Sequence, residues 1–136
     1  MLEQSLKNQS LKNLVLASLL GFLSVMLGAF GAHALEEMLS PEALKSYETG
    51  VRYMMTHSIV LLFINSSSVF GEKTRKTLSY LFFSGILLFS GSIFAISLGL
   101  VEARNIWFVT PLGGLLLLAG WMAMAIALVK YSKEKK

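Results

Sequence analysis

The 136-residue sequence contains no cysteine and few charged side chains. Without cysteine, the chain can form no disulfide, no thiolate metal site and no cysteine nucleophile. Only 15% of the residues are charged, whereas about 25% is usual in a soluble domain. Hydrophobic residues make up 54% of the chain, and its mean hydropathy is +0.64. This composition predicts a single membrane domain over residues 1–136.

Long stretches without Asp, Glu, Lys or Arg divide the sequence. Four of them contain windows of at least 19 residues, at 14–32, 53–71, 77–101 and 105–129. A helix of that length crosses a hydrocarbon core of ~30 Å, because it rises ~1.5 Å per residue. We therefore predict an all-α fold, a four-span transmembrane helix bundle. Its spans are expected at about 14–34, 51–70, 77–101 and 110–129.

The connection between the first two spans contains a helix start, Ser40-Pro41-Glu42. Serine can cap free amides, proline fits the first helical position, and an acid suits the positive helix end. Apolar residues follow at helical spacing up to Gly50, where we expect a hinge. The pattern predicts a short interfacial amphipathic helix near 41–50. Thr110-Pro111 repeats the same cap-then-proline pattern before the fourth span.

Basic residues are distributed unevenly between the two sides of the predicted bundle. With the N-terminus inside, nine of the twelve lie on the inner side, and only Lys45, Arg52 and Arg104 lie outside. The positive-inside rule then places both termini in the cytoplasm. The net charge of +4 is a topology signal on this interpretation, so we expect no nucleic acid partner. No motif in the sequence indicates a cofactor, and we expect none. The lipid bilayer is the expected partner, together with a second copy of the chain or another membrane protein.

The first span also has features of a secretory signal, since Ala32-His33-Ala34 matches an A-x-A cleavage site. Its apolar run from Leu14 to Ala32 is longer than the ~7 to 15 residues of a signal core. We therefore expect this segment to be retained as a membrane span.

Small residues recur in the first span at spacings of three and four, which places them on one helical face. Such a face lets another helix approach closely, because helix contact in lipid depends on packing. Small residues are also common in membrane spans in general, so the pattern allows this role without requiring it. The candidate packing residues are Ala17, Gly21, Ser24, Gly28 and Gly31 in the first span, and Gly113, Gly114 and Gly120 in the last.

Ionisable side chains gather near the outer ends of the first two spans. His57 follows Arg52 by five residues, so it lies ~7 Å deeper along a helix. The second span is the most polar, with His57 and Asn65 inside it, and we expect its polar face to turn toward the other helices. The candidate polar cluster comprises His33, Glu36, Glu37, Glu48, Arg52, Tyr53 and His57.

Four interpretations of this cluster are open. The sequence favours a hydrogen-bonded polar cap that ties the first two helices together. A second is a metal site formed by His33, His57 and a loop glutamate, since imidazole and carboxylate suit zinc and similar ions. A third is a proton or ion path, although no relay of acids or histidines crosses the predicted bundle. The fourth is an enzyme with His57 as general base, which needs a reactive partner that the sequence does not reveal.

Three segments in order resemble a known family. They are Gly28-Ala29-Phe30-Gly31-Ala32-His33-Ala34-Leu35, then Gly50-Val51-Arg52-Tyr53 with His57, and Thr110-Pro111-Leu112-Gly113-Gly114 with Gly120-Trp121. Together they are similar to the YgdD/YwdK-type family of small uncharacterised bacterial membrane proteins, which has a eukaryotic transmembrane relative. The resemblance implies a multi-span protein of the inner or plasma membrane and assigns no catalytic residue.

These observations predict a small integral membrane protein of the bacterial cytoplasmic membrane with a structural or interaction role. The second candidate is a small transporter or ion-conducting oligomer. The third is a membrane-embedded enzyme or metal-binding protein that uses His33 and His57.

Overall fold

The computed structural model describes residues 2–135, with side chains described from residue 9 onward. Within this range the chain forms helices and no strand, which confirms the all-α prediction. The connection after the first helix contains a π-helical turn, η1, and the connection before the last contains a 3-10 turn, η2. In chain order the elements are α1 (Leu2–Phe30), η1 (Gly31–Leu35), α2 (Pro41–Ser66), α3 (Glu72–Ser97), η2 (Ala103–Asn105) and α4 (Val109–Glu134).

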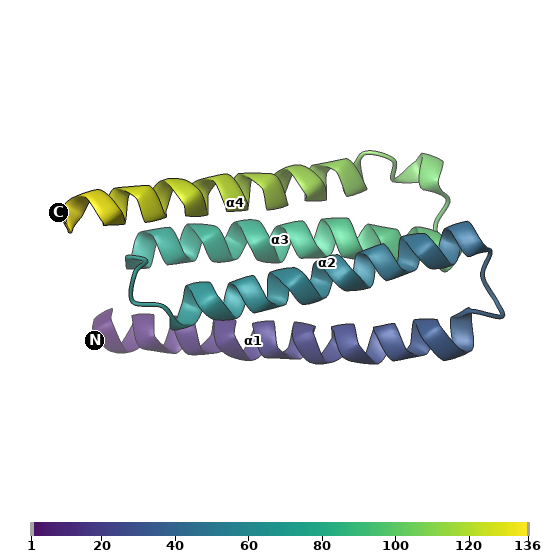
Figure 1. Ribbon diagram of the computed structural model, residues 1–136, viewed down its shortest axis with the longest axis horizontal. Coiled ribbons are helices and arrows are strands. Elements are labelled where there is room, and N and C mark those ends of the chain that lie inside the picture. Colours follow the sequence, from purple (N-terminus) through teal and green to yellow (C-terminus); the bar gives the residue numbers. More distant parts are fainter. Residues whose placement is uncertain (1, 136) are drawn as a thin grey trace.

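The four helices run alternately up and down, so both ends of the chain and the α2–α3 turn lie at one end, the terminal end (Figure 1). The α1–α2 and α3–α4 connections lie at the opposite end, the loop end. Every extensive helix contact joins helices that are consecutive in the chain. Helices α1 and α4 therefore lie on opposite sides of the α2–α3 pair, and the bundle is an open row of helices rather than a closed ring.

Three helical segments are long and apolar enough to cross a membrane, namely Gln9–Leu35, Glu72–Ser97 and Val109–Glu134. They correspond to the first, third and fourth predicted spans. Helix α2, which contains the predicted second span, is not among them, because charged and polar side chains lower its hydropathy. Large apolar side chains are exposed along α1 and α4, as is typical of helices that face lipid.

Helix α2 runs without interruption from Pro41 to Ser66, so the separate interfacial helix expected near 41–50 is its first part. The predicted start is correct, since the Ser40 hydroxyl accepts a hydrogen bond from the Ala43 amide at 3.2 Å. Gly50 is not a hinge. A Cβ atom there would lie 2.8 Å from the Phe94 ring of α3, and the Ser90 hydroxyl donates to the Gly50 carbonyl at 2.8 Å. Gly50 is therefore a point of close contact between α2 and α3.

The start of α4 also differs from the prediction. The helix begins at Val109, and no side chain caps it. The Thr110 hydroxyl instead forms a hydrogen bond with the Ser92 hydroxyl of α3 at 2.6 Å. The side chain that was expected to cap the start of α4 therefore joins α3 to α4.

The small residues of the first span face α2. Ala17 and Ser24 are buried, and a Cβ atom on Gly21 would lie 3.4 Å from the Ser58 hydroxyl. At Gly31 the corresponding atom would lie only 2.8 Å from the Tyr47 ring. The absence of side chains at these glycines lets α1 and α2 approach closely.

Helices α3 and α4 approach even more closely. A Cβ atom on Gly113 would collide with the backbone nitrogen of Phe89, and one on Gly120 would lie 3.0 Å from the Phe82 ring. Around these contacts, buried apolar side chains from all four helices form one core, which includes Ala17, Leu61, Phe82 and Leu117.

Candidate functional site

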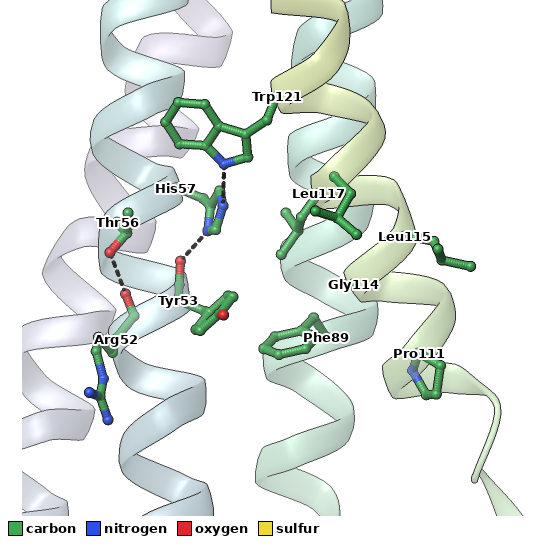
Figure 2. A pocket seen from close by; sticks show the side chains of 11 residues that line it. Arg52, Tyr53, Thr56, His57, Phe89, Pro111, Gly114, Leu115, Leu117 and Trp121 are labelled. Carbon is green, nitrogen blue, oxygen red and sulfur yellow. Dashed lines mark hydrogen bonds between the residues drawn. The ribbon is translucent and has the colours of Figure 1, made fainter.

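The imidazole of His57 is buried on α2, with 4% of the residue exposed, and it faces α4. The indole N–H of Trp121 donates a hydrogen bond to Nε2 at 3.1 Å, and Nδ1 lies 2.7 Å from the Tyr53 carbonyl (Figure 2). An indole nitrogen can only donate and a carbonyl can only accept. These two bonds therefore fix His57 as a neutral imidazole that carries its proton on Nδ1.

Aromatic rings from three helices surround this hydrogen bond. The Phe82 ring of α3 lies 5.6 Å from the His57 ring and meets the Trp121 ring edge-on at 5.9 Å. Toward the loop end, the rings of Tyr53 and Phe89 lie 4.5 Å apart. Aromatic pairs at these distances contribute stability beyond the burial of their surface. The His57–Trp121 bond is thus held in an apolar, well-packed environment.

A groove of about 690 Å³ lies between α2 and α4, with Phe89 of α3 between them (Figure 2). This volume falls in the range of ~300 to 1,000 Å³ that is typical of ligand sites. Leu115 and Leu118 on the α4 side are 62% and 66% exposed, so the groove is open toward the surroundings of the bundle. Its lining residues are Arg52, Tyr53, Thr56, His57, Phe89, Pro111, Gly114, Leu115, Leu117, Leu118 and Trp121.

Most polar groups of the groove are already paired with one another. His57 and Trp121 form one pair, and the Thr56 hydroxyl donates to the Arg52 carbonyl at 2.8 Å. Among residues 9–135, the Arg52 guanidinium has no hydrogen bond or ion pair, and neither has the Tyr53 hydroxyl. Arg52 lines the groove toward the loop end of the bundle, and its side chain lies on the side of α2 away from Phe89 (Figure 2). It also lines a smaller pocket between α1 and α2, of about 310 Å³. The groove therefore combines an apolar interior with one cation at its edge, which it shares with the pocket between α1 and α2.

The two histidines of the sequence do not converge. His33 lies in η1 and is exposed, whereas His57 is buried and directed toward α4. Glu36, Glu37 and Glu48 are exposed as well. Glu48 lies one turn before Arg52 and lines the same small pocket between α1 and α2, but among residues 9–135 no ion pair joins these acids to Arg52 or His57.

The hydrogen-bonded cap between α1 and α2 is therefore not formed by the described side chains, because His57 lies on the side of α2 that faces α4. The Tyr47 hydroxyl connects these two helices instead, by donating to the Leu27 carbonyl at 3.0 Å. Within residues 9–135, no three His, Asp or Glu side chains are grouped closely enough to hold a metal ion. A functional role for the exposed members of the cluster stays a prediction.

A second polar network lies near the terminal end of the bundle. The Asn13 amide of α1 donates to Asn65 Oδ1 at 3.0 Å, and the Asn65 amide donates to the Ser79 hydroxyl of α3 at 2.9 Å. The burial of His57, Ser58 and Asn65 confirms that α2 turns its polar face inward. The sequence indicated Asn65 but not its partners, although an asparagine at the edge of an apolar stretch, such as Asn13, is a usable signal.

The arrangement is suited to binding rather than to proton transfer. Both ring nitrogens of His57 are engaged, so no free lone pair is available for a base or a metal ligand. The two polar networks are separated along α2 by Leu61, which is fully buried. What the groove offers is apolar contact, aromatic surface and a single positive charge.

Comparison with known proteins gives several matches. The family described as "Protein of unknown function (DUF423)" matches residues 27–114. A UPF0382 membrane protein of Haemophilus influenzae is 42% identical over 115 residues, which cover 84% of this chain and 90% of the relative. The UPF0382 membrane protein YwdK of Bacillus subtilis is 35% identical and covers 87% and 96% of the two chains. A UPF0382 membrane protein of Schizosaccharomyces pombe is 40% identical, with 81% and 95% covered. No solved structure shows a significant match.

Proposed function

Because the chain belongs to the DUF423 family, whose matched relatives are named membrane proteins, we propose that it is a four-span protein of the bacterial cytoplasmic membrane with an interaction role. In this proposal both termini and the α2–α3 turn lie in the cytoplasm. The groove between α2 and α4 binds another component of the membrane.

The length and packing of α2 support its assignment as the remaining span. It has 26 residues, as many as α3 and α4, and so extends ~39 Å. Its polar groups His57 and Asn65 are hydrogen-bonded to neighbouring helices, which removes much of the cost of placing them at membrane depth. Its charged residues lie in the first half of the helix, near the loop end, where long side chains can reach the interface.

The observation that carries the interaction role is the open groove itself. A row of helices leaves α2 and α4 separated over Phe89, with exposed leucines beside the hydrogen-bonded pair of buried His57 and partly exposed Trp121. Membrane-protein sites of this kind bind by apolar contact, and a few polar groups give orientation. The groove accounts for the interaction role without any catalytic group.

Site-specific photo-cross-linking in growing cells tests this role. A photoreactive amino acid at Leu118, in the groove, is expected to give one dominant adduct, which its intact mass assigns to a lipid class or a protein. The matched control is Leu87 of α3, which is as exposed but does not line the groove, and it is expected to give lipid adducts in the proportions of the bulk membrane. Identical product patterns from the two positions would contradict a binding role for the groove.

A further inference from the structure

Resting on the proposed binding role, we infer that the occupant of the groove is an anionic phospholipid. Its acyl chain lies against the leucines of α4, and its phosphate lies at Arg52.

The interior of the groove matches an acyl chain. Leu115 and Leu118 line the α4 side, Phe89 lines the α3 side, and the polar pair His57 with Trp121 is already satisfied. An added polar group would gain no partner there and would lose its own hydration. The interior therefore selects an apolar occupant.

The mouth of the groove matches an anion. The guanidinium of Arg104 is ion-paired with Glu102, and that of Arg75 donates to the Ser67 and Phe70 carbonyls. Among the described residues, Arg52 is the arginine without such a partner, and it lies at the groove. A planar guanidinium binds phosphate through paired, charge-assisted hydrogen bonds. The Tyr53 hydroxyl, which has no hydrogen-bond partner among residues 9–135, is a further donor in the lining of the groove.

Charge favours an anionic lipid over an apolar helix of a partner. The lining of the groove contains Arg52 and no Asp or Glu, so an anionic headgroup complements it.

Quenching of Trp121 fluorescence by brominated lipid measures this occupancy. The chain has two tryptophans, and Trp107 is 72% exposed in the α3–α4 connection, so a Trp107→Phe protein leaves Trp121 as the reporter. The protein is reconstituted in two lipid mixtures. One contains brominated phosphatidylglycerol in phosphatidylcholine, and the other contains the same mole fraction of brominated phosphatidylcholine in phosphatidylglycerol. We expect the anionic lipid to be preferred about fivefold at this site, the effect of one basic residue on an anionic headgroup. Because the bromines are on the acyl chain, free phosphate cannot produce the signal.

Three variants in the Trp107→Phe background separate a headgroup site from a general charge effect. Arg52→Gln is expected to abolish the preference, and Arg52→Lys is expected to retain most of it. Lys45→Gln removes the same charge from the same side of the bundle, outside the groove, and is expected to leave the preference intact.

Equal quenching of the Trp107→Phe protein by the two lipids would overturn the inference, because lipid would then enter the groove without a preference for the anionic headgroup. A preference that persists in Arg52→Gln would overturn it as well. If neither lipid quenches Trp121 and quenching appears only on dilution of the protein in lipid, a second copy occupies the groove. That result would overturn the lipid assignment and leave the interaction role intact, whereas featureless cross-linking at Leu118 would count against the interaction role itself.

Discussion

At the scale of single residues, the polar groups of α2 are satisfied by residues that are distant in the sequence. His57 pairs with Trp121, 64 positions away, and Asn65 pairs with Asn13, 52 positions away. The sequence predicted that these side chains face inward, because a polar group in a membrane helix needs a partner. It could not predict the partners, since they depend on which helices become neighbours and at what rotation. His33 was expected near His57 only because both lie at similar depth.

The His57–Trp121 hydrogen bond is expected to show energetic coupling. His57→Leu leaves the indole N–H without an acceptor, and Trp121→Phe leaves Nε2 without a donor, so each should reduce the free energy of unfolding by about 1–3 kcal/mol. The double variant leaves neither group unpaired. Its loss should therefore be smaller than the sum of the single losses by about 0.6 kcal/mol, the average for hydrogen bonds between membrane helices, and by at most about 1.7 kcal/mol.

Reversible unfolding in mixed detergent micelles measures these four proteins as a double-mutant cycle. Trp107→Phe serves as the control, because Trp107 is exposed and has no hydrogen-bond partner among the described residues. Strict additivity of the two single losses would show that the bond contributes nothing to stability.

At the scale of helices, the sequence predicted a helix start correctly where the interacting groups are close together in the chain. Ser40 and Pro41 begin α2 as predicted, because a cap acts on amides three residues away. Gly50 and Thr110 were misread, because their local patterns are the same whether or not another helix contacts them. In the structure Gly50 lies against Phe94, and Thr110 is bonded to Ser92. At both positions, contact with α3 determines the role of the residue.

The contact between α3 and α4 should depend on one glycine far more than on its neighbour. In Gly113→Ala the new methyl group meets the backbone of Phe89, which cannot move unless the helices separate. Overpacking of this kind costs about 1–3 kcal/mol. In Gly114→Ala the methyl group meets only the Phe89 ring, at 3.6 Å, which is an ordinary contact.

Alanine also has the higher helix propensity, by up to about 1 kcal/mol. Gly114→Ala is therefore expected to be neutral or slightly stabilising, and Gly113→Ala clearly destabilising, in the same detergent unfolding assay. If the two variants unfolded alike, the close approach of α3 to α4 at Gly113 would be wrong.

At the scale of the whole molecule, the open row explains both the groove and the composition. Helices α1 and α4 contact the bundle along one side only, so much of their apolar surface remains exposed. The charge-poor stretches predicted this number of helices, and the family matches confirm the resemblance, including a eukaryotic relative. The open arrangement could not be predicted from the sequence, because apolar stretches alone do not distinguish a row of helices from a closed bundle.

The central claim is that α2 crosses the membrane as the second of four spans. The natural absence of cysteine allows a direct measurement, since an introduced thiol is the only one in the chain. Lys73, in the first turn of α3, is exposed at the terminal end, and Lys73→Cys reports the side on which α2 ends. Glu37→Cys and Ser132→Cys, also exposed, serve as references for the two sides.

The measurement is labelling of Lys73→Cys in intact cells by a maleimide reagent that does not cross the cytoplasmic membrane. The four-span arrangement predicts that Lys73→Cys and Ser132→Cys are labelled only after the membrane is permeabilised. Glu37→Cys is expected to be labelled both before and after permeabilisation. Labelling of position 73 in intact cells, to the same extent as position 37, would place α2 on the outer surface and contradict the account.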